Sequence, residues 1–134
     1  MSNVAQYQQV GLLNYINLGS TTNRPAGWAI ALTTGSPTSL AGNDGEPGTA
    51  SGYSRQTCTW AAAAGTPASA TNLAAMTFGP FSSLATLTGI INFDSLATAT
   101  LGNKLWFGTL ATPRVVLTGD SLVIAAGALT SQIT

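Results

Sequence analysis

The sequence contains no histidine and few charged residues of either sign. Lysine and arginine together number 4, aspartate and glutamate number 4, and the formal net charge is zero over 134 residues. Four basic side chains are too few to neutralise a phosphate backbone, so nucleic-acid binding is not expected. Without histidine, the usual proton carrier near neutral pH is missing, and Ser-His-Asp or Cys-His catalysis within the chain is excluded.

Cysteine occurs once, as Cys58, and long apolar runs are missing. A single cysteine excludes an internal disulfide and a thiolate metal cluster, and a small buried thiol is expected at this position. No run approaches the ~20 apolar residues of a membrane-spanning helix. No basic region precedes an apolar stretch at the N-terminus, so neither a Sec signal peptide nor a membrane partner is expected.

The four carboxylates offer poor support for catalysis or metal binding. Asp44 and Glu46 lie in a segment rich in glycine and proline, which does not preorganise a site. Asp94 and Asp120 stand beside turn residues, where a carboxylate usually caps the local backbone. Neither a glycosidase pair nor the spaced oxygen ligands of a calcium loop is recognisable, so no enzyme activity, metal or cofactor is expected. An ion bound by residues 34–52 remains an alternative.

The apolar content predicts a folded domain. Hydrophobic residues make up 45% of the chain, and the mean hydropathy is +0.28. The length is that of one ordinary domain, so residues 1–134 are expected to fold as a single unit. A net charge of zero removes the repulsion between copies and favours association.

Residues 1–19 are expected to hold the one helix. Gly19 is a plausible stop, while Asn3 can cap the start and Gln6 can bond back to it. No lysine or arginine lies on this segment, so we expect the helix to dock on its own domain or on a neighbouring subunit. The apolar residues that recur at helical spacing are Val4, Tyr7, Val10, Leu13 and Ile16, with Leu12 and Tyr15 beside them.

After Pro25 the pattern predicts short strands separated by Gly, Pro, Ser and Thr. The fold is therefore expected to be all-β, an antiparallel β-sandwich (jelly-roll-like) with a short N-terminal α-helix. Pro113 is expected to end a strand, since proline cannot donate to a central ladder. The alanine-rich residues 61–67 are expected to cross between sheets. The expected strands are 28–33, 53–60, 73–78, 85–93, 104–111, 114–117, 121–125 and 128–133.

Residues 34–52 form a long Gly/Pro segment without a strand or helix pattern, which is uncommon in a compact domain. It is either a solvated surface loop or an arm that orders against a neighbouring subunit. Arg55 is expected to pair with one of the few acids, inside the subunit or across an interface. The candidate interface residues are Val4, Tyr7, Leu12, Tyr15, Asp44, Glu46 and Arg55.

The aromatic side chains of the expected strands are interpreted as core residues. Core packing is the commoner role of such residues, and a sugar-binding platform is the alternative. The set is Trp28, Trp60, Phe78, Phe93, Trp106 and Phe107.

One stretch resembles a known family. Residues 52–63, GYSRQTCTWAAA, are similar to the G-Y-x-R-Q-x-[VC]-T-[FW]-x-x-A element of small tailed-phage virion proteins commonly described as tail fibre proteins. Further elements recur in the same order in residues 68–78, 87–94, 105–114 and 119–130. The chain departs from the pattern in residues 35–51, and at Asn92, where an aliphatic or small apolar residue is usual.

The resemblance implies a bacteriophage virion structural protein. Its first form is a head decoration (cement) protein, a homotrimer that binds the major capsid protein on the outer capsid surface and stabilises the shell. The alternative is a tail fibre or tail appendage component that contributes to host attachment. Residues 34–52 hold no aromatic residue of the kind that dominates interfaces, which favours decoration.

Overall fold

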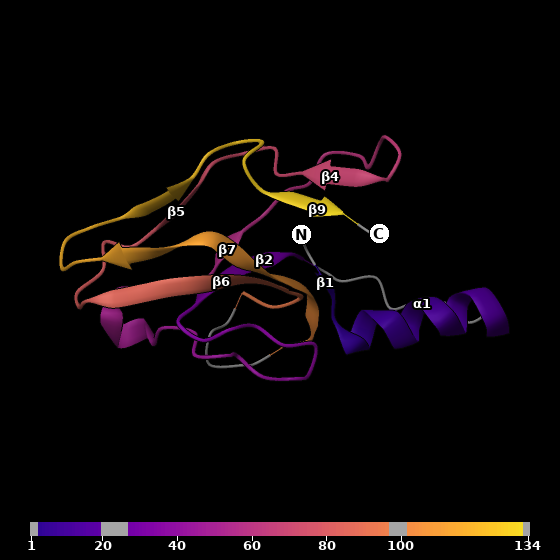
Figure 1. The fold of residues 1–134 in the computed structure, drawn as a ribbon, viewed down its shortest axis with the longest axis horizontal. Helices are drawn as coiled ribbons and strands as arrows, with labels where there is room; N and C mark the ends of the chain where they lie inside the picture. Colours follow the sequence, from indigo (N-terminus) through magenta and orange to yellow (C-terminus); the bar gives the residue numbers. More distant parts are fainter. Residues whose placement is uncertain (1–2, 20–26, 97–101, 133–134) are drawn as a thin grey trace.

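The computed structural model describes residues 3–19, 27–96 and 102–132, and strands dominate this part of the chain (Figure 1). The predicted all-β antiparallel fold with a short N-terminal helix is confirmed. In chain order the elements are β1 (Asn3–Val4), α1 (Gln6–Leu18), β2 (Ala29–Thr33), the 3-10 turn η1 (Thr49–Ser51), β3 (Gln56–Thr57), β4 (Ser69–Thr71), β5 (Met76–Phe78), β6 (Ala85–Phe93), β7 (Lys104–Val116), β8 (Leu122–Ile124) and β9 (Thr130–Gln132).

A five-stranded antiparallel sheet, in the order β1-β7-β6-β2-β3, forms the main layer. The pairs β4-β9 and β5-β8 lie over one of its faces (Figure 1). The core between these layers joins residues of β2, β5 and β6, such as Leu32, Phe78 and Leu87, all fully buried. The sheet therefore has one face covered by strands.

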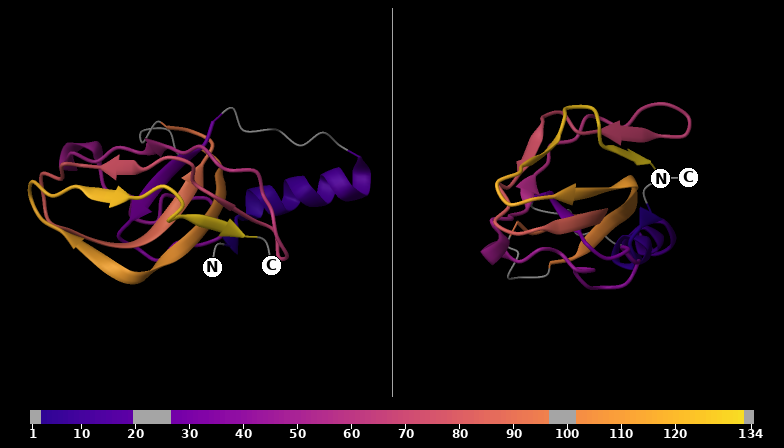
Figure 2. Two further views of the ribbon diagram at one scale, coloured as in Figure 1. Left: turned by 90° about the horizontal axis from the view of Figure 1, so that it is seen from above. Right: turned by 60° about the vertical axis from the view of Figure 1, so that its left-hand side comes forward.

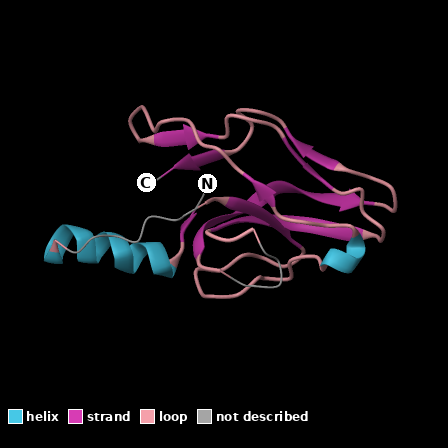
Figure 3. Cartoon of the chain, turned by 180° about the vertical axis from the view of Figure 1, so that it is seen from behind, coloured by secondary structure: helices cyan, strands magenta, loops and turns pink. Residues whose placement is uncertain are grey.

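The second face of the sheet is covered by residues 34–52, which we call the strap. Ala31, Ile91 and Phe93 form a separate buried cluster on this face. Figure 3 shows the strap on the side of the sheet away from β4 and β9. Gly89 makes this close approach possible, because an added Cβ would overlap the ring of Pro37. The strap is thus a surface loop that packs along the sheet of its own subunit, and its contact with a neighbouring subunit stays a prediction.

Both faces of the central strand β6 are consequently buried from Gly89 to Phe93. Leu87 and Ile90 belong to the core between the sheet and the two strand pairs, while Ile91 and Phe93 belong to the cluster beneath the strap. Asn92 is buried as well, at 2% exposure. A strand between two covering layers does not alternate between core and solvent.

Pro113 does not end a strand, contrary to the prediction. β7 runs through it from Lys104 to Val116. In the ladder with β6, Thr109 faces Gly89 and Arg114 faces Leu87, so four residues of β7 oppose one of β6. Pro113 lies in this bulge, where no regular ladder bond requires its missing N–H.

The helix ends as predicted but begins differently. Gly19 closes it in the left-handed conformation at φ 63°. Its N-terminal cap is Ala5, which makes no side-chain cap bond. Asn3 instead belongs to β1, opposite Phe107, because the backbone of this segment pairs with β7. The predicted capping box is therefore wrong.

Candidate assembly surface

Helix α1 buries none of its side chains and extends away from strands β2 to β9, which we call the β-domain (Figure 2). Its large apolar residues range in exposure from 39% at Tyr7 to 76% at Leu18. We call this set the apolar helix surface: Tyr7, Val10, Leu12, Leu13, Tyr15, Ile16 and Leu18.

These apolar residues lie on more than one side of the helix. Leu13 and Tyr15, two residues apart, point about 160° away from each other at 3.6 residues per turn. A helix that is apolar all round is normally a buried one. Each such side chain contributes roughly 1.5–3 kcal/mol when it is removed from water. The apolar helix surface is therefore suited to contacts on several sides at once.

The N-terminal end of α1, which we call its root, is fixed to the β-domain by backbone hydrogen bonds. Ala5 is 1% exposed, and its N–H donates to the carbonyl of Leu105 at 3.0 Å. The N–H of Gln6 donates to the carbonyl of Ser39 in the strap at 3.1 Å. The sheet and the strap thus set the direction in which the helix leaves the domain. Among the described residues, no helix combines the length and apolar character needed to cross a membrane.

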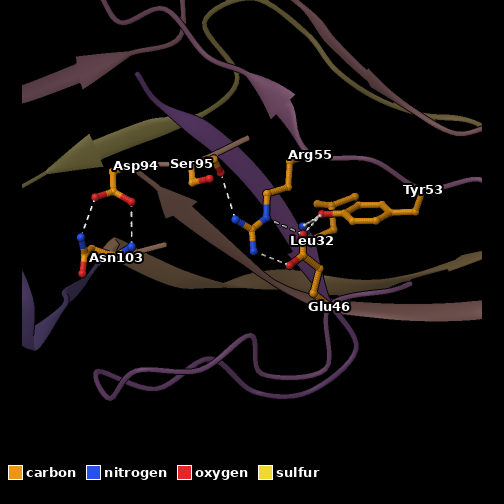
Figure 4. Close-up of polar contacts among 7 residues, drawn as sticks. All are labelled: Leu32, Glu46, Tyr53, Arg55, Asp94, Ser95 and Asn103. Atoms are coloured by element: carbon orange, nitrogen blue, oxygen red, sulfur yellow. Dashed lines mark hydrogen bonds and ion pairs between the residues drawn. The ribbon is translucent and has the colours of Figure 1, made fainter. Parts of the chain in front are cut away.

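Arg55 and Glu46 form an ion pair inside the subunit (Figure 4). The guanidinium donates from Nε and Nη2 to the two carboxylate oxygens, and from Nη1 to the carbonyl of Ser95 at 2.9 Å. The Tyr53 hydroxyl donates to Glu46 Oε1 at 2.9 Å and accepts from the N–H of Leu32. The side chains of Arg55 and Glu46 are 0% and 3% exposed, so this network holds the strap from within.

A second ion pair joins the strap to β7. Lys104 Nζ donates to the carboxylate of Asp44 and to the carbonyl of Thr38. Asp44 also accepts from the Thr38 N–H at 3.1 Å. Asp44, Glu46 and Arg55 thus make their ion pairs within the subunit, and their contact with a neighbouring subunit stays a prediction.

Asp120 caps local backbone, as predicted, whereas the backbone partner of Asp94 lies nine residues away in the sequence. Asp94 accepts from the N–H of Asn103 at 2.7 Å, and Asp120 accepts from the N–H of Leu117 at 2.9 Å. Over residues 3–19, 27–96 and 102–132, no three carboxylate or cysteine side chains come together as a metal-ligand set.

Neither Cys58 nor Tyr53 is activated. Burial raises the pKa of the Cys58 thiol to about 11, which keeps it protonated near neutral pH. Burial, and next the nearby Glu46 carboxylate, raise the pKa of Tyr53 above its usual range. The predicted small buried thiol is confirmed, with Cys58 at 2% exposure.

The structure places the candidate interface residues in three settings, one of which is the internal ion pairs of Asp44, Glu46 and Arg55. Val4 is half-buried at the root of α1, while Tyr7, Leu12 and Tyr15 belong to the apolar helix surface. The candidate set omitted Leu13, Ile16 and Leu18, which are more exposed than any of its members. Their helical spacing was visible in the sequence, but spacing alone does not show that a helix lies away from its own domain.

The comparisons with known proteins give one family. No curated protein matches the chain. The model of the family described as Podophage GP4 fiber I protein gp80 matches residues 3–132, which is nearly the whole chain. The chain therefore belongs to this family of bacteriophage fibre proteins, and it is a virion structural protein of the fibre type.

Proposed function

We propose that the chain is a component of a tail fibre or tail appendage that contributes to attachment of the phage to its host. The match to a fibre family over residues 3–132 is the observation that carries this proposal. The sequence alone favoured a head decoration protein on the outer capsid surface. The family description supports the tail alternative better, and the proposed role requires no bond-making chemistry.

The chain acts in this role as a homo-oligomer joined through α1. Seven large apolar side chains on an uncharged helix are exposed in the single subunit. In a dimer, one side of each helix meets its partner and the opposite side stays in water. In a three-helix bundle each helix contacts two neighbours, which suits apolar residues on more than one side. A trimer with cyclic symmetry is therefore the proposed assembly.

Gold-labelled antibodies against the β-domain, applied to purified virions and viewed by electron microscopy, test the location. Label confined to the tail or its attachment region supports the proposal. Label spread evenly over the head overturns it in favour of decoration, and unlabelled particles that also lack the protein on a blot remove both roles. Virions probed with pre-immune antibody are the control.

A further inference from the structure

All three tryptophans of the chain line one groove. The sequence holds Trp28, Trp60 and Trp106, and they come together between the root of α1 and the β-domain. The groove has a volume of about 340 Å³, in the range of small-ligand pockets. Trp60 and Trp106 meet edge to face, with ring centroids 5.4 Å apart. Gln8 and Leu12 of α1 also line the groove.

The groove also contains a buried amide whose oxygen has no partner. Asn92 lies in β6 between Ile30 of β2 and Trp106 of β7, and it lines the groove at 2% exposure. Among the described residues, its Oδ1 accepts no hydrogen bond, and it is the one buried side-chain polar atom in that condition. An unpaired buried acceptor costs free energy, so its presence beside a groove points to a donor that an occupant supplies.

The lining selects the chemistry of that occupant. None of the residues around the groove is charged, and Gln8, Ser131 and Gln132 supply neutral polar groups. An ionic ligand finds no counter-charge there, and a purely apolar ligand leaves Asn92 unpaired. A sugar ring has C–H faces that pack on indoles and hydroxyls that donate to an amide oxygen.

We propose that this groove binds a neutral saccharide unit, with the indoles against its apolar face and Asn92 accepting from a hydroxyl. Because Oδ1 is buried, the Asn92 side-chain amide must turn to present this oxygen to the hydroxyl. The inference deepens the proposed attachment role and rests on it for its biological setting.

Intrinsic fluorescence tests the proposal, because every tryptophan of the chain reports on this groove. We expect D-glucose, D-galactose or N-acetyl-D-glucosamine to produce a saturable change in emission, and glycerol to produce none. Asn92→Leu removes the acceptor, and we expect it to weaken saccharide binding by about tenfold or more. The thermal midpoint of this variant should not fall, which shows that it folds. Asn92→Ala serves if leucine is too large, and Asn43→Leu, at an exposed position outside the groove, is the matched control.

Three results overturn the proposal. The first is that none of the three sugars changes the emission saturably. The second is equal sugar affinity in the wild type and in Asn92→Leu. The third is an emission change that depends on protein concentration alone, which places the helix of a second copy in the groove. None of these affects gold labelling of the tail, so failure of the saccharide site and failure of the fibre role are distinguishable.

Discussion

Arg55 holds Glu46 through two parallel hydrogen bonds, from Nε at 2.8 Å and from Nη2 at 2.7 Å. The guanidinium also lies over the ring of Phe93, 3.9 Å from its centroid. One arginine thus joins the strap to the apolar cluster on the second face of the sheet. The chain has four acidic residues, and this ion pair uses one of them to hold the strap on the sheet.

Removing one partner of this pair should destabilise the domain strongly. Glu46→Ala leaves a buried guanidinium without its carboxylate, and we expect a loss of about 3–5 kcal/mol in the free energy of unfolding. Urea denaturation followed by circular dichroism measures it. Arg114→Ala removes an exposed guanidinium and should change stability by less than about 0.5 kcal/mol.

Replacing both partners with apolar residues separates the contribution of charge to the free energy of unfolding from the contribution of packing. The double variant Glu46→Leu with Arg55→Met should recover most of the loss, since an apolar pair of similar volume often substitutes for a buried ion pair. A double variant no more stable than Glu46→Ala contradicts this account of the pair.

Gly89 should be intolerant of a methyl group. Gly89→Ala directs a Cβ into Pro37 and Thr33, and overpacking of this kind costs about 1–3 kcal/mol. Gly48→Ala is the matched control, because Gly48 has φ −70° and open space around its Cβ position. Equal thermal midpoints for the two variants would show that the strap is not packed on β6 as described.

Charges on α1 should break the assembly without unfolding the subunit. In Leu13→Glu with Ile16→Glu, both positions are more than half exposed, so the thermal midpoint of the β-domain should change little. The mass by sedimentation equilibrium should fall from that of a trimer to that of a monomer. Val115→Glu with Leu117→Glu introduces the same charge at exposed sites on and beside β7 and should remain a trimer.

The association of the wild type should also be nearly independent of salt. Helix α1 carries no charged side chain, so screening has nothing to act on there. Sedimentation at low and high sodium chloride should give the same association constant. A steep fall of the association constant at high salt would mean that charged residues outside α1 hold the subunits together.

Cys58 should resist alkylation in the folded protein. With its pKa raised to about 11, little thiolate exists at pH 8, and burial also blocks access. Iodoacetamide at pH 8 should label Cys58 slowly in buffer and rapidly in urea, as followed by mass spectrometry. Equal labelling rates would mean that the thiol is open to solvent.

The same pKa shift predicts a loss of stability at high pH. The folded pKa lies above the ordinary value of 9.0, so the stabilisation is complete below pH 9 and is lost as the pH rises toward about 11. Urea midpoints measured across this window should fall more steeply for the wild type than for Cys58→Ala. Parallel curves would contradict the shift.

The predictable strands are those in which a run of strand-forming residues is bounded in the sequence by turn-forming residues. Residues 85–93 were predicted as a strand, and β6 occupies that range, because β-branched and aromatic residues there end at turn-forming ones. The break expected at Pro113 was wrong because a bulge depends on the partner strand, which no local pattern describes. The two-residue strand β1 has no periodicity to detect.

The candidate site was only partly predictable for the same reason. Apolar spacing identified α1, but its exposure depends on where β1 and the strap direct the chain. Pairing of Arg55 with an acid was expected, and the choice of Glu46 depends on the path of the strap over Phe93. The groove joins Trp28, Trp60 and Trp106, which are 32 and 46 residues apart in sequence, so only the fold brings them together.

The copy number of the protein in purified virions tests the fibre role most directly. Quantitative mass spectrometry against the major capsid protein gives the ratio of the two chains. The proposed role predicts a ratio far below one, in line with a few appendages per particle. A copy number comparable with that of the major capsid protein would contradict it and support a decoration protein on the head.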